Sequence, residues 1–211
     1  MTNWQENLHQ FVSAGKIPLA IKIGYTVFVS VLVPVYWWYW GAANFLWFSN
    51  LALLLGLVAI WLESPRLASM QAVSVGIPEV AWNLDFFVEL ITGRRLLGMA
   101  AYMFREDEML WVRGLSLFHV VLPVSLIWLV YRLGYDRRAW MIQTLFAWAV
   151  LLVCYFFTDP TANTNYVFGP GEKPQTFMQP PLYLLLVMAF LPVCVYLPTH
   201  LILRSVMPIR R

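Results

Sequence analysis

The chain has 211 residues, of which 61% are hydrophobic and only 12% are charged. Soluble domains carry about 25% charged residues, so this composition excludes an ordinary soluble protein and predicts an integral membrane protein. The formal net charge of +3 is small, and its positive residues fall near the ends of apolar segments. Charge therefore bears on membrane topology, and no nucleic-acid partner is expected.

The first 16 residues predict a short amphipathic helix that lies on the membrane surface. Trp4, Leu8, Phe11 and Val12 recur at helical spacing, with polar residues between them. An ordinary N-terminal extension would fit the same residues. No cleavable signal peptide is expected, because a basic start followed by an apolar core is missing.

The remainder, residues 17–211, predicts one all-α transmembrane domain of six helices in a bundle. Each predicted span has about 20 residues, the length needed to cross the hydrocarbon core. A shorter apolar stretch, residues 96–104, predicts an interfacial or re-entrant helix between the third and fourth spans. The six predicted spans are residues 17–40, 44–62, 67–91, 115–133, 139–157 and 182–203.

An even number of spans places both termini on one side of the membrane. Of the 14 Lys and Arg residues, nine fall on the side of the termini and five on the opposite side. Cytoplasmic loops carry an excess of these residues, so both termini are expected in the cytoplasm.

Polar side chains of the predicted spans gather in the half that faces away from the cytoplasm. At 1.5 Å per residue, Ser49 lies about 8 Å deep in the second span, and His119 lies about 9 Å deep in the fourth. Asn83 and Asp85 lie near the outer end of the third span. Polar groups inside a membrane tend to face a bundle interior or a wet cavity, so we expect a polar cavity that opens toward the outer leaflet.

Each of these polar residues also has a purely structural interpretation. His119 would be a packed histidine bonded to a carbonyl or hydroxyl group of a neighbouring helix. Glu79, nearer the middle of the third span, would be a hydrogen-bonded carboxyl group that holds helices together. Asp85 and Glu89 would be hydrated near the membrane surface. Ser116 and Ser125 are rivals for any nucleophile role.

Two short motifs resemble a known family of membrane enzymes. The second span begins with Phe45-Leu-Trp-Phe-Ser-Asn-Leu-Ala-Leu53, and the fourth contains Leu117-Phe-His-Val-Val-Leu-Pro-Val124. In this order and spacing they resemble the androgen-induced and androgen-dependent-TFPI-regulating membrane hydrolases, which are six-span proteins that cleave fatty acid esters of hydroxy fatty acids. The chain is also similar, nearly end to end, to an uncharacterised bacterial family of six-span membrane proteins, which implies a bacterial inner membrane.

The hydrolase resemblance implies a nucleophile and a base. Ser49 stands where that family has a threonine, and His119 stands at the histidine that precedes Val-Leu-Pro. Serine in place of threonine departs from the family pattern but keeps the hydroxyl group. The implied reaction is attack of Ser49 on an ester carbonyl of a membrane lipid, with His119 taking the serine proton.

General acyl-transfer chemistry defines candidates for the remaining roles. Asp85 or Asn83 would orient the imidazole, as the third member of a triad does. Asn44 or Asn50 would donate a hydrogen bond to the oxyanion. Hydrolysis and acyl transfer differ only in the group that finally accepts the acyl chain, so the sequence does not separate them.

Two other functions fit the same sequence. A non-catalytic membrane subunit would use its spans, which are rich in aromatic residues, to bind partner helices, lipid or pigment. A small proton-coupled transporter would use Glu79, Asp85, Glu89 and His119 as a relay. His119 has no second histidine at ligand spacing, which argues against a metal site, and no cofactor is expected.

Overall fold

The structure, a computed structural model, describes residues 17–171 and 173–208, and the predicted N-terminal amphipathic helix lies outside these ranges. The described ranges are mostly helical and contain no strand. Four segments of these described ranges are long and apolar enough to cross a membrane, as expected for a helical membrane protein. They are α2 (Leu19–Trp40), α5 with α6 (Leu110–Leu133), α7 (Ala139–Phe157) and α8 through α9 (Pro180–Val206).

Two of these four segments change their geometry part of the way along. The segment of α5 and α6 turns at Leu117 and begins five residues before the predicted start of the fourth span. The last segment contains a π-helical stretch, a geometry that frequently marks functional positions. The parts are α5 (Leu110–Ser116), α6 (Phe118–Leu133), α8 (Pro180–Phe190), η5 (Leu191–Tyr196, the π-helical stretch) and α9 (Leu197–Val206).

The second and third predicted spans are also helical but differ greatly in length. α3 (Phe48–Trp61) has 14 residues, about 21 Å at 1.5 Å per residue, and follows a short 3₁₀ helix, η1 (Ala42–Leu46). α4 (Pro65–Thr92) has 28 residues and carries buried serine, glutamine, glutamate and aspartate side chains. Its length is sufficient for a crossing, whereas its polar content sets it apart from the four apolar segments.

The ends of α4 follow from local sequence signals. The Ser64 side chain accepts a hydrogen bond from the Leu67 N–H at 3.3 Å, and Pro65 occupies the first helical position. Gly93 ends the helix with a φ of 69°, a left-handed conformation that glycine adopts without strain. Pro78 lies inside the helix, where it removes one backbone N–H donor.

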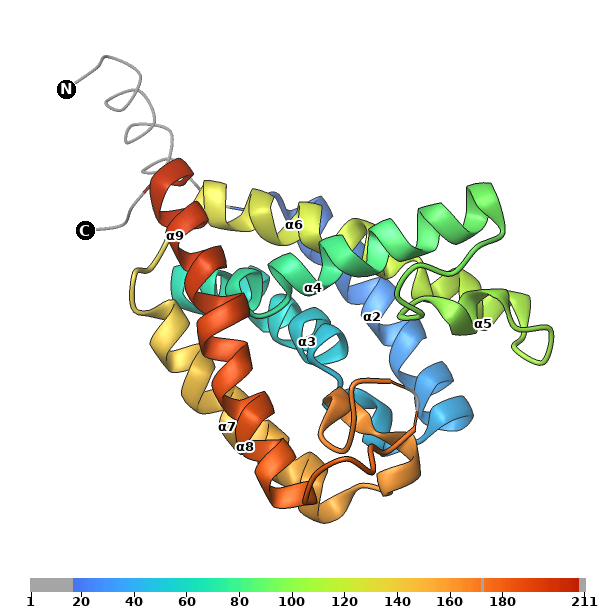
Figure 1. Ribbon diagram of the computed structural model, residues 1–211. Helices are drawn as coiled ribbons and strands as arrows, with labels where there is room; N and C mark the ends of the chain where they lie inside the picture. The colour runs from blue at the N-terminus through green and yellow to red at the C-terminus, as the bar shows by residue number, and fades with distance from the viewer. Residues whose placement is uncertain (1–16, 172, 209–211) are drawn as a thin grey trace.

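α4 lies at the centre of the fold. It packs against α6, α3 and α7, and its first half also contacts α9 and η5 (Figure 1). The largest hydrophobic cluster of the described residues draws on α2, α3, α4 and α6. The buried polar side chains of α4 are therefore surrounded by protein, which gives their hydrogen bonds particular weight.

The connection between α4 and α5 differs from the prediction of a helix over residues 96–104. Most of it is irregular, and only η2 (Ala101–Phe104) forms a short 3₁₀ helix. The connection packs through Ala100 and Met103 onto Trp82 and Phe86 of α4. Leu96 and Leu97 remain exposed, because their backbone is bound to a side chain of α4 instead of to a helical turn.

The segment between α7 and α8 contains two more 3₁₀ turns, η3 (Pro160–Ala162) and η4 (Thr164–Tyr166). Asn165 of η4 accepts a hydrogen bond from the Phe48 N–H at 3.0 Å and donates one to the Leu46 carbonyl at 2.7 Å. This segment therefore holds the start of α3.

Candidate active site

The main polar contact between α4 and α6 joins Glu79 to His119. The Nδ1 atom of His119 lies 2.9 Å from Oε2 and 3.1 Å from Oε1 of Glu79. The Glu79 side chain is 1% exposed, and the His119 side chain is 13% exposed. A carboxyl group buried this deeply needs a partner, and the imidazole supplies it.

The rest of the His119 ring is fixed by aromatic packing. Its centroid lies 4.5 Å from that of Trp82, with an angle of 19° between the planes, and the ring also stacks on Phe118. Nδ1 is the nitrogen bonded to Glu79, whereas Nε2 has no hydrogen-bond partner among the described residues and is not fully buried. A carboxyl group on one nitrogen and an accessible second nitrogen is the arrangement of a general base.

Asn83 lies one turn after Glu79 on the same face of α4, as the spacing predicts. Its Nδ2 atom donates to the backbone carbonyl of His119 at 2.8 Å and to the carbonyl of Glu79 at 2.7 Å. Asn83 thus ties the backbone of α6 to α4 beside the imidazole, and the ring itself is oriented by Glu79.

Three hydroxyl groups lie close together where α2, α5 and η2 meet. The hydroxyl of Tyr36 on α2 lies 2.7 Å from Oγ of Ser116 on α5, and both residues are buried. Tyr102 of η2 points toward Ser116 and lies within the electrostatic reach of Glu79; burial raises the pKa of Tyr102, so its hydroxyl stays protonated. The sequence indicated Ser116 as a rival nucleophile, whereas it gave no signal that singled out Tyr36 or Tyr102.

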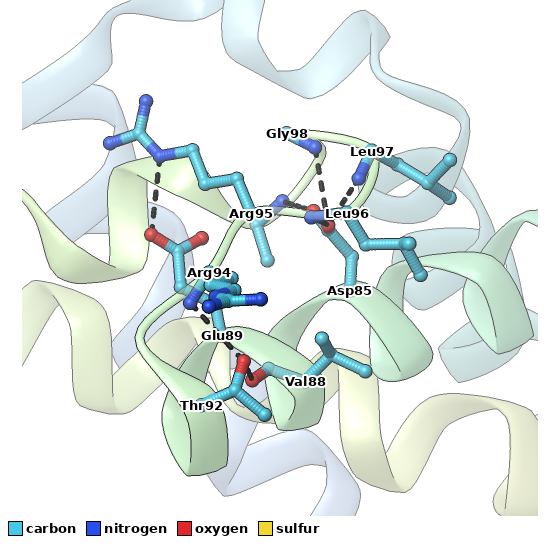
Figure 2. Close-up of polar contacts among 10 residues, drawn as sticks. Asp85, Val88, Glu89, Thr92, Arg94, Arg95, Leu96, Leu97 and Gly98 are labelled. Atoms are coloured by element: carbon cyan, nitrogen blue, oxygen red, sulfur yellow. Dashed lines mark hydrogen bonds and ion pairs between the residues drawn. The ribbon is translucent and has the colours of Figure 1, made fainter.

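Asp85 has a different role from the one its position predicted. One of its oxygens accepts hydrogen bonds from the N–H groups of Leu96, Leu97 and Gly98 at 2.6 to 3.2 Å, and the other accepts from the Ala100 N–H at 2.8 Å (Figure 2). These four donors occupy the carboxylate, which holds the connection after α4 in place.

Glu89 supports the same connection through a charged partner. Glu89 lies one turn beyond Asp85 on α4. Its Oε1 atom lies 3.1 Å from Nε of Arg95 in the connection (Figure 2). The prediction that Asp85 and Glu89 are hydrated is therefore wrong, because both carboxyl groups are buried and accept hydrogen bonds from the protein.

Ser49 is the second residue of α3 and is half-buried. Within residues 17–171 and 173–208, no hydrogen bond joins Ser49 to His119, and the carboxyl group on His119 belongs to Glu79. The predicted oxyanion donors lie near Ser49 along the chain: Nδ2 of Asn50 donates to the Asn44 carbonyl at 2.8 Å, and Nδ2 of Asn44 is buried without a partner among the described atoms.

The described residues contain no group of three or more His, Cys, Asp or Glu side chains arranged to hold a metal ion. Comparison with protein-family models, with curated proteins and with solved structures found no match for the chain.

Proposed function

We propose that the protein crosses a bacterial inner membrane six times, with both termini in the cytoplasm. The four long apolar segments support this topology, and α3 and α4 would supply the other two crossings. The excess of Lys and Arg on the side of the termini sets the orientation. A C-terminal fusion to a reporter that is fluorescent only in the cytoplasm should be bright, and a dark fusion would exclude this orientation.

The function that the geometry favours most is lipid-ester hydrolysis or acyl transfer with His119 as general base. The observation that carries the proposal is the buried Glu79 carboxyl group on Nδ1 of a histidine whose Nε2 remains accessible. Such a carboxyl group orients the ring and stabilises the imidazolium that forms when Nε2 accepts a proton. The substrate is a membrane lipid ester, since this imidazole lies among apolar helices.

The proposed step begins when Nε2 of His119 takes the proton of a hydroxyl group whose oxygen attacks the ester carbonyl carbon. The carbon–oxygen bond to the leaving alcohol then breaks, and His119 returns the proton to that alcohol. Ser49 is the attacking group in a two-step route through an acyl-enzyme, which requires α3 to bring it to His119. Water or a lipid hydroxyl is the attacking group in a one-step route.

Turnover of a fluorogenic long-chain ester by the purified protein in nanodiscs tests the proposal. His119→Ala should reduce turnover by about 10³-fold. Ser30→Ala, which changes a lipid-facing serine of α2, should leave turnover unchanged. Labelling by a fluorophosphonate probe that disappears in Ser49→Ala assigns the two-step route, and turnover that survives in Ser49→Ala assigns the one-step route. Absence of both turnover and His119-dependent labelling would exclude the hydrolase.

Proton-coupled transport is a second candidate, favoured by three neighbouring hydroxyl groups. Tyr36, Ser116 and Tyr102 lie together, Tyr102 is within the electrostatic reach of Glu79, and such groups form proton relays in membrane transporters. Solute uptake into proteoliposomes that responds to an imposed pH gradient, and that is lost in Glu79→Gln, would establish this function. Co-purification of a stoichiometric partner or pigment would instead indicate a membrane subunit.

A further inference from the structure

α4 presents a second set of buried polar side chains, on a face that points away from His119. Gln71 and Ser74 lie one turn apart on α4, and Ser74 contacts Gln143 of α7. Tyr196 of η5 faces Ser74 and Gln143, and all four residues are at most 2% exposed. Three separate elements thus direct uncharged polar groups into one closed region of the protein interior.

Direct contacts satisfy only part of this region. Nε2 of Gln143 donates to Oγ of Ser74 at 2.9 Å. The Tyr196 hydroxyl faces Gln143 and Ser74 but makes no well-formed hydrogen bond with them. Three buried atoms, Oε1 of Gln143, Nε2 of Gln71 and the Tyr196 hydroxyl, therefore have no partner among the described residues. Rotating the Gln143 amide by 180° would exchange its two atoms and still leave one unpaired.

Two backbone features add to the polarity of the region. Pro78 has no N–H, so the carbonyl of Ser74 lacks the donor that an ordinary helix would provide four residues later. Tyr196 lies at the end of the π-helical stretch, whose wider turn alters the direction of the side chains on η5. Both features lie in the part of the fold where the unpaired side chains meet.

We propose that Gln71, Ser74, Gln143 and Tyr196 form a binding site for ordered water that joins α4, α7 and η5. A water molecule donates two hydrogen bonds and accepts two, which suits an amide oxygen, an amide N–H and a hydroxyl group, and buried waters typically make about three such bonds. A cation fits less well, because the site contains no carboxylate and one of its free groups is an N–H donor.

Radiolytic hydroxyl labelling of the wild-type protein in nanodiscs tests the site, because bound water generates radicals beside a residue that bulk solvent does not reach. Tyr196 should be labelled, whereas Tyr135 should not. Tyr135 is a matched control, since it is also fully buried but bonds its hydroxyl directly to Nδ1 of His200 at 2.8 Å. Equal absence of label at both tyrosines would overturn the proposal.

The melting temperature of Tyr196→Phe provides an independent test. If water binds the hydroxyl, its removal should lower the melting temperature, because the water loses a partner. An unchanged or raised melting temperature would overturn the proposal, since a truly unpaired buried hydroxyl is unfavourable. Sodium and choline salts distinguish water from a bound cation. If sodium but not choline raises the melting temperature of the wild type, and sodium has no such effect on Tyr196→Phe, the site binds a cation and the water proposal is overturned.

Discussion

Glu79 and Asp85 are both carboxyl groups of α4, six residues apart, and they are 1% and 0% exposed. Asp85 accepts four hydrogen bonds from backbone N–H groups, which have fixed positions and keep their protons. Glu79 contacts an imidazole, whose other nitrogen is free to accept a proton from a reacting group. Equal burial on one helix therefore gives two different environments: Asp85 binds fixed backbone donors, and Glu79 binds the imidazole on which the proposed reaction depends.

Removal of His119 is the most severe test of the chemical side of this comparison. His119→Ala should reduce ester turnover in nanodiscs by about 10³-fold, the scale associated with loss of a general base. His200→Gln is the control, because His200 is a buried histidine that bonds to Tyr135 far from Glu79. If the two variants lose turnover equally, His119 has no special role in the reaction.

Removal of Asp85 tests the structural side. Asp85→Ala leaves four N–H groups of the connection after α4 without an acceptor, and it should lower the free energy of unfolding by about 3 kcal/mol. Unfolding in mixed detergent micelles with increasing dodecyl sulfate measures this change. Asp159→Ala is the control, since Asp159 is exposed and binds only the next turn of its own loop. If Asp85→Ala lowers the free energy of unfolding no more than Asp159→Ala does, Asp85 does not anchor the connection after α4.

Glu79→Gln separates the charge of the carboxyl group from its shape. The amide still reaches His119, so folding should change little, but an imidazolium would no longer be stabilised and turnover should fall about 10²-fold. Turnover and unfolding are measured on the same preparation. Full turnover together with a large loss of stability would mean that the pair only holds α4 and α6 together.

Tyr36→Phe should have the smallest effect. It removes one buried hydrogen bond between α2 and α5, to Ser116, and should cost about 1 kcal/mol of unfolding free energy. Tyr131→Phe, on the exposed face of α6, serves as the control and should have no measurable effect. A drop in turnover beyond the lost stability would place the Tyr36 hydroxyl in the reaction itself.

Much of the helical layout could be predicted, because apolar runs of about 20 residues and local end signals are visible in the sequence. Ser64-Pro65 and Gly93 bound α4 within two residues of the predicted span. The connection after α4 was less predictable, since its conformation depends on backbone N–H groups that bind Asp85, and every residue type except proline offers such a donor.

The partner of His119 could not be found from depth along the spans. Depth placed Ser49 and His119 at one level, but contact also depends on which helices are neighbours and which faces they share. α6 packs mainly on α4, so the nearest polar group on that face, Glu79, binds the ring. Glu79 and Asn83 are four residues apart, a spacing that puts both on one face of α4, and this spacing was the available signal.

The hydrogen bonds between Asn165 and the start of α3 have a consequence for the order in which segments enter the membrane during synthesis. α3 is about 21 Å long, shorter than the hydrocarbon core of about 30 Å, and its first N–H group, that of Phe48, is bound by a residue 117 positions later. If α3 crosses the membrane as proposed, it is inserted well before Asn165 leaves the ribosome. Until α7 and the segment after it have been inserted, the Phe48 N–H at the start of α3 must therefore be hydrogen-bonded by another acceptor.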